Sequence, residues 1–432
     1  MVFQFSALPT RRVAVIGGGI SGMAAARLLA RENAVVLFES EGRLGGHART
    51  VMAGKRGDQP VDMGFIVFNR VNYPHLVQLF GELDVPVAPS NMSFGASIDG
   101  GRIEFGLRNL RAVFAQRRNI ANPAYLGMLR DIFRFNAHAD RLARDPAMTL
   151  GELLEALGTG RWFRDYYILP LSGAIWSTPV QGIIDFPARA LIDFFRNHAL
   201  MSAWGQHPWF TVRGGSVEYV RRLQAALVAD GCDLRLGTAV AGVRRQGGGA
   251  QVRVTGGAWE PFDEVVMATH ADVSLRLLSD AGPDERAALS AIRFQPNEVV
   301  LHSDTSLMPR RRAAWASWVY VQPRGARPDR IDLTYWMNSL QPIPEDDPLF
   351  VTLNSNAPIR DHLVHDTVTF DHPVYDTRAA AGRAAVAAMQ GRNATWFCGA
   401  WMKNGFHEDG FASAVDVVEA MRARTVAAVA AE

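Results

Sequence analysis

Three glycines near the start of the chain have the spacing of a phosphate-binding loop: Gly17, Gly19 and Gly22. They follow an apolar run at 12–16 and open an Ala- and Leu-rich segment at 23–30. A second apolar run at 35–38 ends at Glu39. Strand, glycine loop, helix, strand and acid in this order form the fingerprint of a dinucleotide site. The chemistry expected here is therefore the binding of a diphosphate and a ribose.

Each glycine has a separate physical task in such a loop. Gly17 permits the tight turn, Gly19 lets the backbone approach the pyrophosphate, and Gly22 lets the helix pack closely on the strand. The first helical residues, Ile20 and Ser21, would offer free N–H groups and a partial positive charge to the phosphates. A tight turn without a ligand is the alternative interpretation.

The acid after the second run indicates which nucleotide is bound. Glu39, followed by Ser40, is placed to hold the hydroxyl groups of an adenosine ribose. An acid at this point favours a free ribose over a 2′-phosphate. The sequence thus predicts a Rossmann-type α/β domain that begins near the N-terminus.

Arg43, Gly45 and Gly46 stand shortly after this acid. The pattern resembles the second motif of the glutathione-reductase-type flavoproteins, in particular of their amine-oxidase and phytoene-desaturase branch. The resemblance implies that the cofactor is non-covalent FAD, that the glycine pair lies against its phosphates, and that Arg43 contacts it. A surface turn with a solvated arginine is the alternative.

The C-terminal end of the chain resembles the same branch. A short apolar strand ends at Gly399, and after a loop a helix is expected to begin around 408–414. In the branch, N–H groups at this helix start stabilise negative charge on the reduced flavin. The resemblance makes five residues here cofactor contacts: Gly399, Asp409, Gly410, Phe411 and Ala414. The branch often has an acid directly after the strand glycine, where this chain has Ala400, so Asp409 is a candidate for that role.

Two internal segments also resemble the same branch, and the resemblance places them beside the adenine and the flavin of the cofactor. The backbone of Val240, after a short strand, would contact the adenine. The segment 62–65 would run beside the flavin, with Gly64 allowing close backbone approach and Phe65 next to it. For each of these segments a purely structural turn is the alternative.

Four further segments resemble one bacterial subgroup of NAD/FAD-binding, amine-oxidase-like proteins: 61–74, 169–176, 213–216 and 405–410. Members of the subgroup are commonly encoded near cyclopropane-fatty-acid-synthase-like methyltransferases. The resemblance therefore implies an apolar or lipid substrate.

His407 is the candidate catalytic residue, because an imidazole is the side chain most able to move a proton near neutral pH. It stands in the loop that leads into the C-terminal helix. Glu408 and Asp409 could hold His407, cap the helix or bond the ribityl chain. The alternative is that all three residues serve only as cap and cofactor anchor.

Three functions stay open on the sequence alone. The first is hydride removal from an apolar substrate, a methylated or unsaturated fatty acyl chain, with oxidation or desaturation. The second is amine oxidation, for which many members of the branch use a lysine in a substrate-domain strand. This chain has only Lys55 and Lys403, and the corresponding strand, 297–302, contains neither. The third is a flavin-bound protein with a structural or regulatory role.

Aromatic residues are dense in the middle of the chain: Trp162, Phe163, Tyr166, Tyr167, Trp176, Trp204, Trp209, Phe210, Trp315, Trp318, Tyr320, Tyr335 and Trp336. Most are expected to be core residues. Because FAD enzymes bury substrate between two domains, an apolar tunnel lined by some of them is the alternative.

These motifs divide the chain into an α/β FAD-binding domain and an inserted α+β substrate domain. The FAD-binding domain is expected to comprise 1–75, 211–290 and 390–432. We expect 76–210 to be a mainly helical insertion and 291–389 to form the substrate-domain sheet.

Composition excludes several other classes of protein. The 432 residues are 48% hydrophobic and 20% charged, which is typical of a globular chain, and no apolar run approaches the ~20 residues that span a bilayer. A net charge of +2 argues against nucleic acid as a partner. Two cysteines, Cys232 and Cys398, supply neither a disulfide framework nor a metal cluster. With no signal-peptide pattern, a cytoplasmic location is expected; the sequence does not indicate an oligomeric state.

One segment suggests contact with a membrane. Residues 107–135 mix six arginines with many apolar residues. A basic amphipathic surface can lie on anionic headgroups and open a path for acyl chains. The segment therefore suggests peripheral contact with the inner face of the membrane, and an ordinary helix pair with a solvated arginine face is the alternative.

Overall fold

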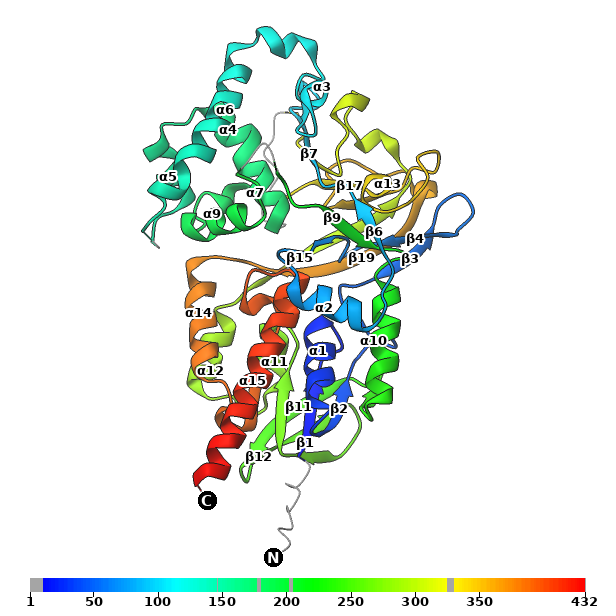
Figure 1. Ribbon diagram of the computed structural model, residues 1–432, viewed down its shortest axis with the longest axis vertical. Helices are drawn as coiled ribbons and strands as arrows, with labels where there is room; N and C mark the ends of the chain where they lie inside the picture. Colours follow the sequence, from blue (N-terminus) through cyan, green and yellow to red (C-terminus); the bar gives the residue numbers. More distant parts are fainter. Residues whose placement is uncertain (1–10, 146, 177–179, 202–204, 325–329, 432) are drawn as a thin grey trace, which may run out of the picture.

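Figure 1 shows the computed structural model, which describes residues 11–145, 147–176, 180–201, 205–324 and 330–431. The lower half of the view holds a parallel sheet with its helices, and the upper half holds a second sheet beside a helical lobe. Residues 1–10 of the expected FAD-binding domain and Trp204 lie outside the described residues.

A five-stranded parallel sheet forms the centre of the lower domain, in the order β10-β2-β1-β14-β20. Its strands are β1 (Arg12–Ile16), β2 (Ala34–Phe38), β10 (Asp233–Arg235), β14 (Glu264–Met267) and β20 (Thr395–Phe397). The strands are short and apolar and are mostly buried on both faces, as a parallel sheet requires. The predicted Rossmann-type α/β fold is confirmed.

The two faces of this sheet are covered in different ways. Helices cover one face, among them α1 (Ile20–Leu29), α10 (Val217–Ala229) and α15 (His407–Ala431). The other face packs on an antiparallel sheet of β11 (Val240–Gln246), β12 (Gly249–Val254) and β13 (Trp259–Phe262), with α11 (Ala271–Leu277), α12 (Pro283–Ser290) and α14 (Thr377–Ala388) beside it. The arrangement brings the N-termini of α1 and α15 to the same end of the parallel sheet (Figure 1).

The substrate domain contains a seven-stranded sheet in the order β19-β15-β18-β17-β16-β7-β8. Its strands are β7 (Phe94–Ile98), β8 (Ile103–Gly106), β15 (Phe294–His302), β16 (Trp318–Val321), β17 (Leu333–Trp336), β18 (Phe350–Leu353) and β19 (Val364–Pro373). Neighbours are antiparallel except β16 and β7. Small sheets of β3 (Thr50–Ala53) with β4 (Gln59–Asp62), and of β5 (Phe68–Asn69), β9 (Trp209–Val212) and β6 (Val87–Ser90), connect it to the lower domain.

The segment 76–210, which was predicted to be mainly helical, also contains strands. It supplies β6, β7, β8 and β9, and β7 and β8 complete one edge of the substrate sheet. Every residue of β7 and β8 is buried, and runs of four or five residues are too short for their periodicity to distinguish strand from helix.

The helical lobe begins only after these strands. It comprises α3 (Leu110–Val113), η1 (Arg117–Ala121), α4 (Pro123–Leu142), α5 (Leu150–Leu157), α6 (Arg161–Phe163), η2 (Arg164–Ile168), α7 (Leu169–Trp176), α8 (Val180–Ile183) and α9 (Ala188–Asn197). Outside the lobe, α2 (Pro74–Glu82) and α13 (Met337–Leu340) pack near the sheets. Buried side chains of α4, α5 and α7 share one core with those of β7, β8 and β15. The lobe and the substrate sheet therefore form one packed unit above the FAD-binding domain.

Candidate cofactor and active site

The glycine loop between β1 and α1 has the geometry of an anion cradle. Gly17 has φ +109°, and a Cβ placed on Gly22 would lie 1.8 Å from the Gly17 carbonyl oxygen, so Gly22 permits the helix to pack. A Cβ placed on Gly19 would meet nothing within 4 Å. Gly19 is also the N-cap of α1 and provides no side-chain cap, so the N–H groups of Ile20 and Ser21 stand at an uncapped helix start.

The second glycine motif docks directly on this loop. The Gly45 N–H donates to the Gly18 carbonyl at 2.9 Å, and a Cβ on Gly46 would lie 3.2 Å from the Gly19 Cα. The Arg43 guanidinium donates to the carbonyl oxygens of Gly46 (3.1 Å) and Ala48 (3.2 Å). Arg43 therefore holds the second motif in shape, and its contact with the cofactor stays a prediction.

Glu39 links the loop to the second strand. One of its carboxylate oxygens accepts the Gly18 N–H at 2.6 Å, and the other accepts the Glu41 N–H at 2.8 Å and the Ser40 hydroxyl at 3.0 Å. Sequence reasoning missed Gly18, although the three consecutive glycines were a signal. A Cβ there would lie 2.6 Å from the Leu44 side chain and 2.9 Å from the Glu39 carboxylate.

The segment before Val240 lies beside the ribose acid. The Thr238 N–H donates to the Glu39 carbonyl at 2.8 Å, and the Gly237 N–H donates to the Glu41 carbonyl at 2.8 Å. Val240 itself begins β11 and is half-buried. The structure thus brings the candidate adenine segment and the candidate ribose acid together.

The start of α15 packs on the start of α1. A Cβ on Gly410 would lie 2.7 Å from the Ile20 side chain and 2.9 Å from the Ser21 hydroxyl. At the end of β20, the Gly399 N–H donates to the Ser413 hydroxyl at 2.9 Å. The N-termini of α1 and α15, which are about 390 residues apart in the sequence, therefore lie close together in space.

Two residues of α15 that were expected to contact the cofactor are buried. Ala414 has no exposed surface, and its contact with FAD stays a prediction. Phe411 is buried and stacks on His75 with ring centroids 5.6 Å apart. Both residues follow the helix start and face the core between α15 and its neighbours, which the sequence pattern could not distinguish from a cofactor-facing side.

Glu408 and Asp409 bind backbone groups. The Glu408 carboxylate accepts the N–H groups of His75 (2.9 Å) and Leu76 (3.0 Å) and so caps α2. The Asp409 carboxylate accepts the Phe406 N–H at 2.9 Å, and burial raises the pKa of Asp409 to about 6. Glu408 therefore caps α2, and the expected bond of either acid to the ribityl chain stays a prediction.

His407 lies in an apolar environment. Its Nε2 is 2.5 Å from the Tyr219 hydroxyl, and its ring stacks on Phe65 at 4.0 Å. Burial lowers the pKa of His407 to about 3, so the imidazole is uncharged at neutral pH. The low pKa disfavours protonation of His407 near neutral pH, and a role of His407 in proton transfer stays a prediction.

The segment 62–65 is fixed from both sides. The buried Asp62 carboxylate accepts the Thr50 hydroxyl (2.6 Å), the Ser216 N–H (2.8 Å) and the Gln341 amide (3.0 Å), while burial raises the pKa of Asp62 to about 6. A Cβ on Gly64 would lie 2.0 Å from the His47 carbonyl oxygen. That oxygen also accepts the Phe65 N–H at 3.2 Å, so this segment lies directly against the chain that leaves Gly46.

Three histidines that the sequence analysis did not single out meet at this place; we call His47, His270 and His372 the imidazole cluster. His47 stacks on Phe370 at 4.5 Å, and its ring centroid is 5.7 Å from that of His372 and 5.8 Å from that of His270. The His47 Nε2 is buried and has no hydrogen-bond partner among the described residues. Burial lowers the pKa of all three, to about 4 for His372. No group in the described part of the chain has a metal-binding arrangement of His, Cys, Asp or Glu.

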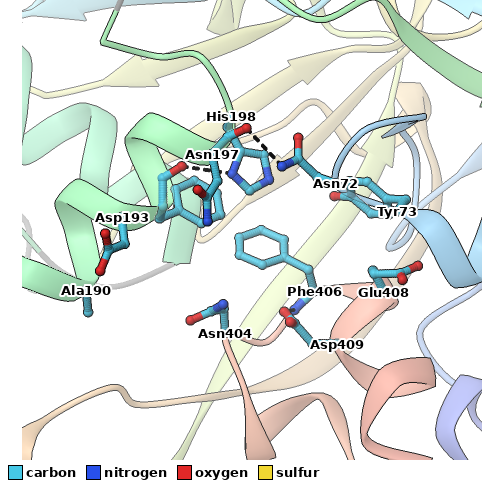
Figure 2. A pocket seen from close by; sticks show the side chains of 11 residues that line it. Asn72, Tyr73, Ala190, Asp193, Asn197, His198, Asn404, Phe406, Glu408 and Asp409 are labelled. Atoms are coloured by element: carbon cyan, nitrogen blue, oxygen red, sulfur yellow. Dashed lines mark hydrogen bonds between the residues drawn. The ribbon is translucent and has the colours of Figure 1, made fainter. Parts of the chain in front are cut away.

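A cavity of about 280 Å³ opens beside the loop that precedes α15 (Figure 2). Its lining comes from the residues before α2, from α9 and the residue after it, from the loop before α15 and from the first turn of α15: Asn72, Tyr73, Ala190, Asp193, Phe194, Asn197, His198, Asn404, Phe406, Glu408 and Asp409. Phe406 points into the middle of this group and stacks on Phe194 with centroids 4.9 Å apart. Because His407 follows Phe406, the cavity approaches the cofactor region from the helical lobe.

The residues present fit a dinucleotide cofactor. The open space at Gly19, the uncapped α1 start and the adjacent Glu39 form a place for a pyrophosphate and a ribose. His47 directly follows Gly46, and a polar group of the cofactor could pair with its Nε2, which has no partner among the described residues. Fold and site together define a Rossmann-type flavoprotein.

Comparison with known proteins assigns the family. Residues 20–309, more than half of the chain, match the family described as flavin containing amine oxidoreductase, and the chain belongs to this family. Protoporphyrinogen oxidase 2, chloroplastic/mitochondrial, of Arabidopsis thaliana is 50% identical over 50 residues, which are 11% of this chain and 10% of that protein.

Solved structures share the whole fold at low sequence identity. The CLA-producing fatty acid isomerase from P. acnes has a TM-score of 0.64 and 16% identity, covering 95% of this chain and 98% of its own. A variant of putrescine oxidase has a TM-score of 0.69 and 15% identity, covering 96% of this chain and 100% of its own. At such identities the likeness shows the fold.

The protein is thus an FAD-dependent oxidoreductase of the amine-oxidase-like class. Cys398, at the end of β20, is fully buried, and burial raises the pKa of its thiol to about 12, so it presents no thiolate for attachment of the flavin. We therefore still expect FAD to be held without a covalent bond. Among the described helices, none has the length and apolar character needed to cross a membrane.

Proposed function

We propose that the protein oxidises or desaturates an apolar substrate, a fatty acyl chain, by removing hydride from one of its carbon atoms. FAD, when bound, accepts the hydride. In a desaturation, the adjacent carbon also loses a proton, which passes to the bulk solvent outside the site, so that the acyl chain loses two electrons and two protons and gains a C=C bond. The chain's own residues must bind and orient the acyl segment and exclude water from it.

The observation that carries this proposal is that the imidazoles near the candidate cofactor site are uncharged. Burial lowers the pKa of His47, His372 and His407, so all three are neutral at neutral pH. The rings packed on them, Phe65 and Phe370, are apolar. Neutral imidazoles and aromatic rings suit an uncharged C–H donor better than an ammonium group, which needs a counter-charge when it is desolvated.

The position of the lysines also argues against amine oxidation. Lys55 bonds the loop that contains Asp346 and Asp347, and Lys403 pairs with Asp416 at 2.8 Å. Neither belongs to β15, the strand that corresponds to the lysine-bearing strand of many amine oxidases. Among the solved structures, the name of the P. acnes enzyme gives a fatty acid as its substrate, which supports the acyl class for this chain.

Several aromatic side chains near the interface of sheet and lobe leave surface available to an acyl chain. Trp318 and Tyr335 pack edge to face at 5.2 Å on adjacent strands and are half-buried, as is Phe406. Phe163, Tyr167 and Trp176, in contrast, are buried core residues. The apolar tunnel is therefore expected along the first group, between the sheet and the lobe.

The experiment that tests the function is anaerobic bleaching of the bound flavin. We would offer a free unsaturated fatty acid, vesicles of an acyl phospholipid, and a primary alkylamine. Bleaching by a lipid but not by the amine supports the proposal. Bleaching by the amine alone overturns it in favour of amine oxidation, and no bleaching by any of the three favours a non-catalytic flavin-bound role.

The membrane face is the second part of the proposal: the surface of α3, η1 and α4 lies on anionic lipid. Four of the eight exposed large hydrophobic side chains in the described residues belong to this surface: Leu110 (78% exposed), Ile120 (57%), Leu126 (43%) and Phe133 (65%). A solvated arginine face alone would not expose such side chains together.

The charge of the same surface is complementary to anionic headgroups. Six arginines lie within 107–135: Arg108, Arg111, Arg117, Arg118, Arg130 and Arg134. The one acid of this segment, Asp131, is buried and accepts hydrogen bonds from Arg130 and the Gly160 N–H. Figure 1 places α3 and α4 at the upper end of the helical lobe, away from the FAD-binding domain. Such a surface can take acyl substrates from a bilayer.

Sedimentation with vesicles tests this surface. We expect binding to phosphatidylglycerol vesicles at low salt and weak binding to phosphatidylcholine vesicles or at high salt. Leu110→Ser with Phe133→Ser should reduce binding, whereas Val228→Ser, an exposed valine on α10, is the matched control and should not. Equal binding to neutral vesicles, or no binding at all, would show that this surface does not recognise an anionic bilayer.

A further inference from the structure

Strands β15 and β19 carry a chain of directed hydrogen bonds that ends at the imidazole cluster. The Glu298 N–H donates to the Asn354 Oδ1 at 3.0 Å, which fixes the orientation of that amide. The Asn354 Nδ2 therefore donates to the Asn297 Oδ1 at 2.7 Å, and the Asn297 Nδ2 donates to the His372 Nδ1 at 3.0 Å. Both asparagines are buried.

This chain determines the tautomer of His372. Its Nδ1 accepts a hydrogen bond and so carries no proton, because the Glu298 N–H orients the Asn354 amide and Asn354 in turn orients the Asn297 amide. The proton of the neutral imidazole must therefore be on Nε2. This Nε2–H makes no hydrogen bond to a described residue, and His372 is half-buried, so the Nε2–H is available to a group outside the folded chain.

The Nε2–H of His372 lies close to the phosphate loop, where the substrate domain meets the FAD-binding domain. His372 stacks against His47, which directly follows Gly46, and Gly46 touches Gly19 of the phosphate loop. The Nε2 of His47 likewise has no hydrogen-bond partner among the described residues. Two neighbouring imidazoles, one from each domain, thus present unused nitrogen atoms to the same region.

We propose that Asn354 and Asn297 orient His372 so that its Nε2–H donates a hydrogen bond to the isoalloxazine ring of bound FAD. Asn297 and Asn354 are positioning residues in this arrangement. A donor to the ring stabilises the reduced, more electron-rich flavin relative to the oxidised one and so raises its midpoint potential. The proposal requires bound FAD and is independent of which substrate is oxidised.

The test is a spectroelectrochemical titration of the flavin in the purified holoprotein. His372→Leu removes the donor, and we expect the two-electron reduction equilibrium to shift about tenfold toward the oxidised form, which is about 30 mV. His372→Gln supplies an amide N–H and should stay near the wild-type potential. His365→Gln, on the same strand but exposed and bonded to Ser303, is the control and should not change it.

The outcomes separate as follows. A lower potential in His372→Leu that His372→Gln restores supports the proposal, and equal potentials in the two variants overturn it. If His372→Leu does not fold or retain FAD, Asn297→Ala decides, because it keeps the imidazole but frees its tautomer. A lowered potential and altered flavin spectrum in Asn297→Ala support the proposal; a wild-type potential and spectrum overturn it.

Discussion

The two ends of the candidate cofactor site are built from different parts of the chain. At the phosphate end, two short segments, 17–22 and 39–46, contact each other through backbone atoms, as in the bond from Gly45 N–H to Gly18. At the other end, the imidazole cluster and His407 bring together side chains from four distant segments. A site whose binding groups are backbone atoms requires glycines at a fixed spacing in the sequence. A site whose binding groups are side chains requires only that distant elements pack together.

Glycine substitution should give the largest effects and should separate packing from binding within the phosphate end. Gly22→Val would place Cβ 1.8 Å from the Gly17 oxygen, so we expect a loss of stability of about 3 kcal/mol or more together with loss of FAD. Gly19→Val enters open space at φ −72°, so the apoprotein should fold normally while FAD affinity falls at least ~100-fold. Thermal melts and flavin content measure the two effects. Stoichiometric flavin in Gly19→Val would mean that the pyrophosphate lies elsewhere.

Arg43 tests whether the second motif needs its side-chain clamp. Arg43→Ala removes the bonds to the Gly46 and Ala48 carbonyls, and we expect FAD affinity to fall about tenfold because the glycine pair loses its fixed shape. Arg43→Lys should restore little, since an ammonium lacks the fork that reaches both carbonyls. Isothermal titration of the apoprotein with FAD measures this, with exposed Arg56→Ala as control. Wild-type affinity in Arg43→Ala would show that the loop holds its own shape.

The imidazole end should respond to acid. The pKa values of His372 and His407 are lowered to about 4 and about 3, so the unfolded chain binds more protons than the folded one between those values and about 6.5. Their contribution to stability is therefore complete above pH ~6.5 and is lost as the pH falls toward 4. We expect a loss of about 1 kcal/mol per imidazole at pH 5, since both are half-buried. His372→Gln and His407→Gln should flatten the decline of melting temperature below pH 6.5. An unchanged pH profile in both variants would show that these groups already titrate alike in the folded and unfolded states.

His407 should give the smallest effect on the reaction. His407→Phe keeps a ring on Phe65 but removes Nε2, and we expect full FAD content and flavin reduction within about threefold of the wild-type rate at pH 7. The reason is that a neutral imidazole with so low a pKa exchanges few protons at that pH. Stopped-flow reduction measures the rate, and Tyr219→Phe tests the partner hydroxyl. A fall of ~10²-fold or more in His407→Phe would restore His407 as a proton-transfer group.

The sequence by itself determined the FAD-binding domain and the phosphate end of the site. Gly17, Gly19, Gly22 and Glu39 lie within one strand–helix–strand unit, so local propensity and spacing specify their geometry. The strand 12–16 was predictable for the same reason, since it depends on a few adjacent residues.

The arrangement of the imidazole cluster and His407 at the other end depends on the tertiary structure. His47, His270 and His372 are far apart in sequence, and the strand pairing of β15 with β19 and the docking of the two domains bring them together. The same holds for His407, whose charge state depends on burial against Phe65 and Tyr219, and for Ala414, whose side of α15 faces the core. Desolvation and long-range packing depend on what surrounds a residue in space, and a linear pattern of residue types carries no direct record of that surrounding.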